Sequence, residues 1–203
     1  MLTIHGRRNS HNVKKVLWLA DELGLAYDRR DVGLEYGMDE AYLAKNPNAL
    51  IPTIEDGDLI VWESNAILRY LAARYGREAW WPADAGTRAI ADKWMDWQLG
   101  YAEVQRAMFM NMVRRPAAER DMAVVERGAR RCGEMMLILE RYLARSPWLS
   151  GEAIGIGDLP IGTYAHTWFT LAIERPDTPH VAAWYARLRE RAAYAEHVMI
   201  PLT

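Results

Sequence analysis

Ser10 and Asn12 are polar side chains that could do chemistry, because they lie at or just before the start of a predicted helix. Unpaired backbone N–H groups and the positive end of the helix dipole favour an anion there, and a hydroxyl or amide adds a donor. A thiolate is such an anion, and stabilising it lowers the pKa of its thiol. Taken alone, Ser10 is better explained as an N-cap, the commoner role of serine at this position.

Glu63 and Ser64 form a second polar pair, at the start of another predicted helix. Their simplest role is capping, since a carboxylate in the first turn complements the helix dipole. As an alternative, the Ser64 hydroxyl and backbone N–H would hold a ligand carboxylate while Glu63 meets a ligand ammonium group. The free α-amino acid end of a ligand carries both of these groups.

The Ile51-Pro52 bond lies in a segment, residues 45–75, that also contains a turn, a hairpin and the helix start at Glu63. Proline cannot donate a ladder hydrogen bond, so Pro52 belongs at a strand entry or a tight turn. The peptide before it is then exposed to something other than protein. An exposed backbone edge beside a helix N-terminus suits an extended, peptide-like ligand.

The hydrophobic periods predict the order β-α-β-α-β-β-α for the first part of the chain. A helix between the first two strands makes a crossover, which implies that these strands pair in parallel. Asp56-Gly57 is a hairpin signal between the last two strands. The predicted strands are residues 2–6, 26–32, 53–55 and 59–62, and the predicted helices begin near Val13, Asp39 and Glu63.

Residues 78–86 lack hydrophobic periodicity and predict a linker between a first domain, residues 1–77, and a second, residues 87–203. The second domain shows helical spacing and no strand signal, so we expect it to be all-helical. Two long helices are expected to end before Pro116 and Pro147. Their predicted apolar faces are Ile90, Trp94, Trp97, Tyr101, Val104 and Met108 on the first, and Val125, Ala129, Cys132, Met136, Leu139 and Leu143 on the second.

The composition is that of a globular protein with a substantial core, since 51% of the 203 residues are hydrophobic. Lys and Arg number 25 against 27 Asp and Glu, so no overall field draws the chain to nucleic acid or to an anionic membrane. Arg7, Arg8, Lys14 and Lys15 form a local basic cluster close to the Ser10 turn. No apolar run matches a membrane span and no signal peptide is evident, so we expect a cytoplasmic protein.

The single cysteine, Cys132, excludes an internal disulfide and any Cys-x-x-Cys metal or redox pair. Sulfur chemistry would therefore use a thiol brought by a ligand. The five histidines show no metal-ligand spacing, so we predict no metal site. Neither a nucleotide-binding glycine motif nor a G-x-S-x-G motif is present, which leaves nucleotide binding and serine hydrolysis without support.

These features together resemble the cytosolic glutathione transferase family over essentially the whole chain. The most specific part is Ile51-Pro52 followed by Trp62-Glu63-Ser64-Asn65-Ala66-Ile67, combined with the element order and the helical second half. The resemblance implies a thioredoxin-like first domain, a cis Ile51-Pro52 bond and glutathione as cosubstrate. It also implies that the Ile51 backbone, beside Pro52, pairs with the cysteinyl part of glutathione, and that Glu63 and Ser64 bind the γ-glutamyl end.

The segment from Ser10 to Val16 is similar to a Thr/Ser-Pro-Asn-Gly-x-Lys-Val pattern in some bacterial members. This likeness favours a bacterial branch, serine-type and theta-like or nu-like, in which the hydroxyl residue and the Asn both approach the glutathione sulfur. His11 and Val13 replace the usual proline and glycine. The loop shape, and the choice between Ser10 and Asn12 as thiolate donor, therefore stay open.

The resemblance also suggests how the ends of the ligands are held. A basic residue near the position of Lys45 often meets the glycyl carboxylate of glutathione, although an ordinary solvated lysine explains Lys45 equally well. The electrophile pocket is expected between the two domains. Its expected lining is Tyr101, Met108, Phe109, Met112 and Trp168, residues that helical periodicity alone would place in the core.

The capping box that the family carries in its second domain corresponds here to Gly155-Ile156-Gly157-Asp158. Asp158 is kept, but Gly155 replaces the hydroxyl residue. Glycine is a tolerated N-cap that leaves half of the reciprocal box unmade. We therefore expect a cost to helix stability and no effect on chemistry.

The activity that the resemblance implies is the addition of glutathione thiolate to apolar electrophiles, with Ser10 and Asn12 stabilising the thiolate. A glutathione-dependent disulfide-bond reductase or isomerase would use the same thiolate. A non-catalytic binding or scaffold protein would keep only the fold. The resemblance also implies a homodimer, with Tyr70 and Trp97 as candidate interface residues.

Overall fold

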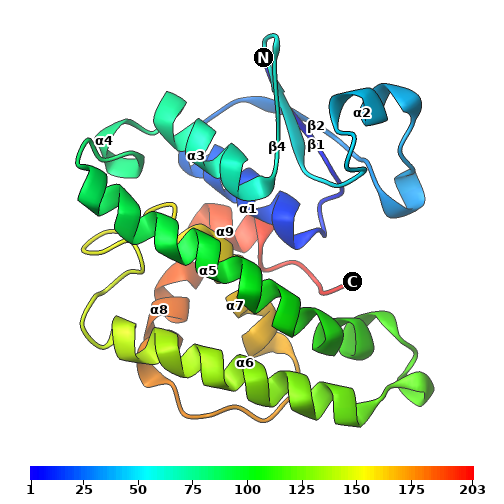
Figure 1. Ribbon diagram of the computed structural model, residues 1–203, viewed down its shortest axis with the longest axis vertical. Helices are drawn as coiled ribbons and strands as arrows, with labels where there is room; N and C mark the ends of the chain where they lie inside the picture. The colour runs from blue at the N-terminus through cyan, green and yellow to red at the C-terminus, as the bar shows by residue number, and fades with distance from the viewer. The chain divides into compact units, whose positions relative to one another are not determined.

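The computed structural model describes all 203 residues, and these form two compact units (Figure 1). The first unit contains residues 1–83 together with residues 192–200. The second contains residues 84–191 and the last three residues. Compared with the predicted boundaries, the first unit gains a segment from near the carboxyl end of the chain. Sequence spacing offers no sign of this return, because residues 192–200 are separated from the first unit by the whole helical unit.

A four-stranded mixed sheet forms the centre of the first unit, with the strand order β2-β1-β3-β4. Strands β1 and β2 are parallel, as the predicted crossover requires, and β3 is antiparallel to both β1 and β4. Asp56 pairs with Leu59, so the hairpin turn is Gly57-Asp58, with Gly57 at a φ of 61°. The strands are β1 (Leu2–His5), β2 (Tyr27–Arg30), β3 (Thr53–Asp56) and β4 (Leu59–Trp62).

Helix α1 (His11–Glu22) is the most deeply buried helix segment of the first unit, since every residue from Val13 to Ala20 is buried. It packs against α3 (Ser64–Tyr75) and against the returning helix α9 (Ala192–His197). The remaining helical elements of this unit are the 3₁₀ turn η1 (Leu34–Tyr36), α2 (Glu40–Lys45) and the short α4 (Arg77–Trp80), which overlaps the start of the predicted linker.

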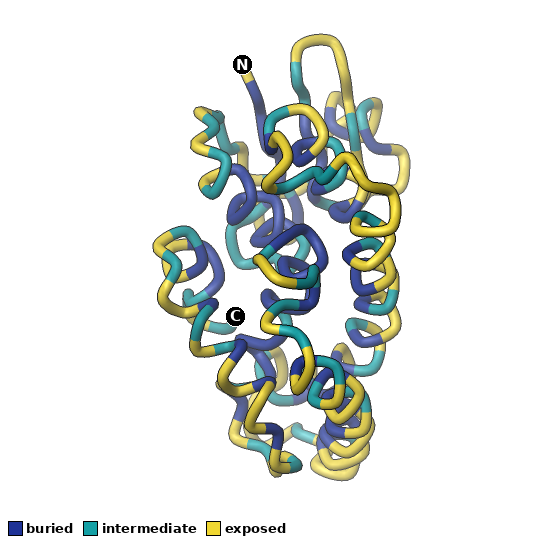
Figure 2. The backbone as a smooth tube through the Cα atoms, turned by 90° about the vertical axis from the view of Figure 1, so that its left-hand side faces the viewer, coloured by how far each residue is buried: buried dark blue, intermediate teal, exposed yellow.

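The second unit is helical, which confirms the predicted fold class. Helix α5 packs against α6 and α7, and α6 also packs against α8. Helices α5, α6 and α8 each have a buried and an exposed side, so the burial colours alternate along them in Figure 2, whereas α7 is buried over almost its whole length. The elements are α5 (Ala85–Phe109), the π turn η2 (Met110–Arg114), the 3₁₀ turn η3 (Ala117–Glu119), α6 (Met122–Leu143), α7 (Asp158–Thr170) and α8 (Pro179–Arg189).

The two long helices differ in how well their apolar faces were predicted. All six predicted face residues of α6 are buried. On α5, Trp94, Tyr101 and Met108 are buried as expected, but Ile90 is exposed. Ala91 is buried in its place, because successive residues of a helix point about 100° apart and the buried face is offset by one position. The prediction for Ile90 was wrong.

The start of α7 corrects the expected cost of Gly155. Asp158 accepts a hydrogen bond from the backbone N–H of Gly155 at 3.1 Å, which is the half of the box expected to remain. The hydroxyl that residue 155 lacks is supplied by Ser150, whose Oγ accepts the N–H of Gly157 at 3.1 Å. A Cβ on residue 155 would lie 2.8 Å from the Ser150 side chain, so glycine at 155 makes room for this substitute cap. The expected destabilisation is therefore offset.

Candidate functional site

Ser10 is the N-cap residue of α1, and its backbone carbonyl accepts the N–H of Lys14 at 2.9 Å. Its side chain makes no capping hydrogen bond, although serine at this position normally does. Ser10 and Asn12 are both partly exposed. The hydroxyl is thus placed at the positive end of a helix dipole without being used by the helix itself.

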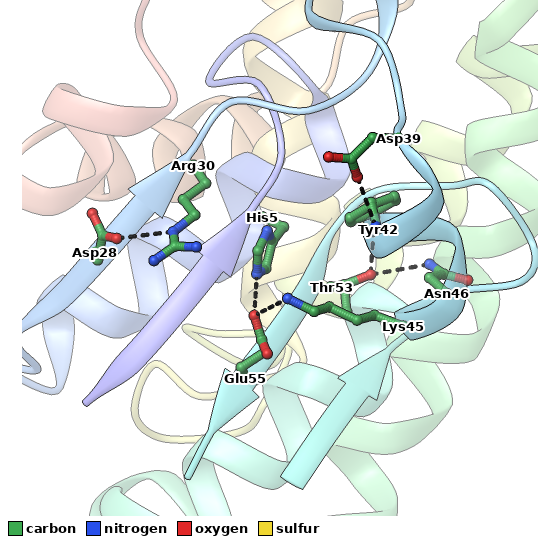
Figure 3. Close-up of polar contacts among 9 residues, drawn as sticks. All are labelled: His5, Asp28, Arg30, Asp39, Tyr42, Lys45, Asn46, Thr53 and Glu55. Carbon is green, nitrogen blue, oxygen red and sulfur yellow. Dashed lines mark hydrogen bonds and ion pairs between the residues drawn. The ribbon is translucent and has the colours of Figure 1, made fainter. Parts of the chain in front are cut away.

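The Ile51-Pro52 bond is cis, as the resemblance implied, and α2 holds the chain on both sides of it. Tyr42 donates to the carbonyl of Leu50 and shares a 2.9 Å hydrogen bond with the Thr53 hydroxyl. The Asn46 amide donates to the same two groups, at 2.9 Å to Leu50 and at 3.1 Å to Thr53. Figure 3 shows the contacts of Tyr42 and Asn46 with Thr53. Ile51 lies between these two anchored residues, so its conformation is held in place, and the residue is partly exposed.

Close packing brings the Ile51 turn and the start of α1 together. A Cβ on Gly6 would lie 2.4 Å from Val13 of α1 and 3.3 Å from Cβ of Ile51. Gly6 has a φ of 147°, which also favours glycine at this point. The absence of a side chain at residue 6 therefore lets the cis-proline turn approach the turn that carries Ser10.

Glu63 and Ser64 lie at the start of α3 in different environments. Glu63 is exposed, has a φ of 71° and makes no capping hydrogen bond. Ser64 is buried, and its Oγ accepts a hydrogen bond from Nζ of Lys15 at 3.2 Å. Nζ of Lys15 also donates to Oδ1 of Asn65 at 3.4 Å.

The position of Lys15 differs from the one expected from the sequence. Lys14 and Lys15 were expected in a local basic cluster, but both side chains are buried. Burial lowers the pKa of Lys15 to about 7, against the opposing influence of Glu63. Burial and the neighbouring charge of Arg8 lower the pKa of Lys14 to about 8. Two adjacent lysines carry no sequence signal for burial, because helix α1 is covered on more than one side.

Lys45 is held by an ion pair within the sheet region. Its Nζ lies 2.8 Å from Oε1 of Glu55, and Nε2 of His5 contacts the same oxygen at 2.6 Å (Figure 3). The hydrogen bond from Lys45 is the main reason that the pKa of Glu55 is lowered. A contact between Lys45 and a glycyl carboxylate stays a proposal.

The residues expected to line the electrophile pocket fall into two groups within the second unit. Tyr101, Met108 and Trp168 are fully buried, whereas Phe109 and Met112 are partly exposed. A surface cavity of about 730 Å³ between α6 and residues 172–176 includes none of the five. Pocket lining by these residues stays a proposal, and Phe109 and Met112 are its more accessible members.

Several other features bear on chemistry. Cys132 is buried, and burial raises the pKa of its thiol to about 12, so it is present as a protonated thiol at neutral pH. No group of three or more His, Cys, Asp or Glu side chains is arranged to hold a metal ion. None of the helices is both long enough and apolar enough to span a membrane.

Comparisons with known proteins agree on one family. Residues 4–79 match the family described as glutathione S-transferase, N-terminal domain. The chain is 41% identical over 208 residues to glutathione S-transferase GstB of Escherichia coli strain K12, with all of both chains covered. It is 30% identical to glutathione S-transferase 3 of Zea mays, covering 99% of this chain and 95% of that one.

Among solved structures, the chain is similar to the theta class glutathione S-transferase of Xanthomonas axonopodis pv. citri with glutathione bound. The TM-score is 0.95 and the sequence identity 47%, covering all of this chain and 99% of the other.

Proposed function

Because the chain belongs to the glutathione S-transferase family, we propose that it binds glutathione in the first unit and transfers the glutathione thiolate to an apolar electrophile. The γ-glutamyl end would bind at Glu63 and Ser64, the cysteinyl part along the backbone of Ile51 beside Pro52, and the glycyl carboxylate near Lys45. The main support for this proposal is the start of α1, where the Ser10 hydroxyl makes no capping bond and is available to a ligand.

In the proposed reaction, the glutathione thiol loses its proton to water, and the Ser10 hydroxyl or the Asn12 amide donates to the resulting thiolate. The thiolate sulfur then forms a bond to the electrophilic carbon, and the leaving group departs in a substitution or a proton adds in an addition. Most of the rate enhancement would come from positioning and from the lowered pKa of the thiol. No covalent intermediate with the protein is required.

The pKa of the bound glutathione thiol tests this mechanism, by titration of thiolate ultraviolet absorbance in the complex. We expect a pKa at least one unit below the ordinary value of about 8.5. Ser10→Ala and Asn12→Ala, titrated separately, identify the donor as the one whose removal raises this pKa. An unshifted pKa in the unmodified protein would contradict thiolate activation.

Two further properties are proposed from family membership. The protein would act as a cytoplasmic homodimer, with Tyr70 and Trp97 near the interface. Tyr70 donates to Oδ2 of Asp56 at 2.7 Å, and Trp97 stacks on Tyr101 with ring centroids 5.8 Å apart. Sedimentation of the purified protein tests the dimer.

Parallel assays with a model aryl halide and a model disulfide separate transferase from reductase activity, and turnover of the disulfide alone would favour the reductase.

A further inference from the structure

Lys15 of helix α1 has no exposed surface, which is unusual for lysine. Its ammonium group donates to Ser64 Oγ at 3.2 Å and to Asn65 Oδ1 at 3.4 Å, and both acceptors belong to the first turn of α3. The two helices pack directly against each other (Figure 1). Lys15 therefore joins the helix that begins at Ser10 to the turn proposed to bind the γ-glutamyl end.

Charged groups around α1 come from three places. The start of α3 carries Glu63, which raises the pKa of Lys15, while burial has the larger, opposite influence. Helix α9 brings Glu196 and His197, which pair with Arg8 and Asp21. The third place is α1 itself, which carries Lys14, whose Nζ donates to the carbonyl of Val198 at 3.3 Å, and Glu22, which accepts from the Trp18 indole at 2.9 Å.

We propose that Lys15 is a positioning residue for the γ-glutamyl carboxylate of glutathione, and that it takes up a proton when this carboxylate binds beside Ser64. The inference rests on the function proposed above. It adds a role for a residue that does not itself need to touch the ligand.

The protonation state of Lys15 sets the direction of the Ser64 hydroxyl. A lysine ammonium group has three donors and no acceptor. Protonated Lys15 must therefore donate to Ser64 Oγ, and the Ser64 hydrogen is left to point elsewhere. It can then donate to a ligand carboxylate, which is the hydrogen bond that the proposed site requires. Neutral Lys15 has a lone pair and would compete for the same hydrogen.

The charge of a bound carboxylate would also act on Lys15. An opposite charge within about 4 to 6 Å favours the ionised form of a group. A carboxylate on Ser64 would lie close to the Lys15 ammonium group and would raise its pKa above the value of about 7 in the free protein. Binding then includes proton uptake at pH values above 7. Affinity must fall as pH rises from the free pKa to the bound pKa, by at most tenfold per pH unit.

Calorimetry with S-methylglutathione tests the proposal, because this ligand keeps the γ-glutamyl carboxylate and has no ionisable thiol. For the unmodified protein we expect Kd to rise severalfold between about pH 6 and about pH 8. Titrations at about pH 7.5 in two buffers of different ionisation enthalpy should show net proton uptake. The measurement uses the intact chain.

The main variant is Lys15→Met, which keeps the length of the side chain but removes its charge. We expect at least a tenfold higher Kd at about pH 6 and almost no change of Kd with pH above that. Lys14→Met is the matched control, since Lys14 is the adjacent buried lysine and bonds Val198 instead of α3. It should keep the pH dependence of the unmodified protein. The ligand amine titrates in all three proteins, so comparing them removes its contribution.

Each outcome decides the inference. An unmodified protein that binds S-methylglutathione without proton uptake would overturn the role of Lys15 and leave the proposed function standing. The same would follow if Lys15→Met bound like the unmodified protein, or if Lys14→Met lost the pH dependence equally. No binding of either glutathione or S-methylglutathione by the unmodified protein would overturn both. The two-buffer measurement needs no variant, so a Lys15→Met protein that failed to fold would not prevent the test.

Discussion

The starts of α3 and α7 each carry an acidic residue, Glu63 and Asp158. The two carboxylates differ in burial and in hydrogen bonding. At α7, Asp158 is fully buried and its two oxygens accept four N–H groups. The donors are the backbones of Leu149, Ser150 and Gly155 and the indole of Trp184, at 2.8 to 3.2 Å. At α3, Glu63 is exposed and makes no capping hydrogen bond.

This difference separates a folding element from a candidate binding element. Every acceptor position of Asp158 is occupied by the protein, so the α7 start has nothing to offer a ligand. The α3 start has an exposed carboxylate that makes no capping hydrogen bond, and Glu63 has a φ of 71°, which costs about 1 to 3 kcal/mol for a residue other than glycine. Strain that the surrounding structure maintains is frequent at ligand sites, which agrees with the proposed role of Glu63.

The largest expected effect is on stability, at α7. Asp158→Ala should lower the free energy of unfolding by about 3 to 5 kcal/mol, because it leaves buried N–H donors without acceptors. Urea denaturation measures the change. Asp121→Ala is the control, since Asp121 caps α6 through one exposed bond to Val124 at 3.2 Å and should cost about 1 kcal/mol. Equal losses of unfolding free energy in Asp158→Ala and Asp121→Ala would show that the buried carboxylate of α7 contributes no more than an ordinary exposed N-cap.

The next effect is on affinity, at α3. Ser64→Ala should raise the Kd of glutathione about tenfold, because a hydrogen bond to the ligand carboxylate is lost. The folded state should remain intact, as the near-ultraviolet circular dichroism spectrum will show. Calorimetry gives the Kd. A normal Kd with lowered stability would mean that the start of α3, like that of α7, serves folding alone.

The smallest effect concerns the substitute cap of α7. Ser150→Ala should cost about 1 kcal/mol of unfolding free energy, the usual value of a lost N-cap, and leave the Kd of glutathione unchanged. Gly155→Ser alone should not stabilise the protein, because its side chain would meet Ser150. Combined with Ser150→Ala, it should recover part of the loss. If the changes in unfolding free energy of Ser150→Ala and Gly155→Ser were additive in the double variant, a serine at 155 would not be taking over the cap that Ser150 provides.

Much of the fold was predictable because it depends on local patterns. Alternating and helical periods identified the strands and helices, and the crossover identified the parallel pairing of β1 and β2. Helix α6 followed its predicted face because it is amphipathic, with one continuous apolar stripe. The predicted burial of Ile90 on α5 was wrong, because an offset of one residue is enough to turn a side chain from the buried face to the exposed one.

The residues proposed for the site can be named from the sequence, but the contacts that hold them in place cannot. The Ile51-Pro52 and Glu63-Ser64 motifs are contiguous in the sequence, so they are recognisable without a structure. The contacts of Tyr42 and Asn46 around the cis-proline turn join residues 4 to 11 positions apart through side chains whose directions spacing does not reveal.

By itself, the sequence determined the order of elements, the family and the turns at which glutathione is proposed to bind, because each depends on residues close together in the chain. Only the tertiary structure decided that Lys15 is buried against Ser64, that Ser150 replaces the hydroxyl missing at Gly155, and that residues 192–200 pack on α1. The first and third results depend on segments far apart in the chain meeting in space, and the second depends on how the loop before α7 folds. Burial, which sets the pKa of Lys15, is a property of that packing and not of local sequence.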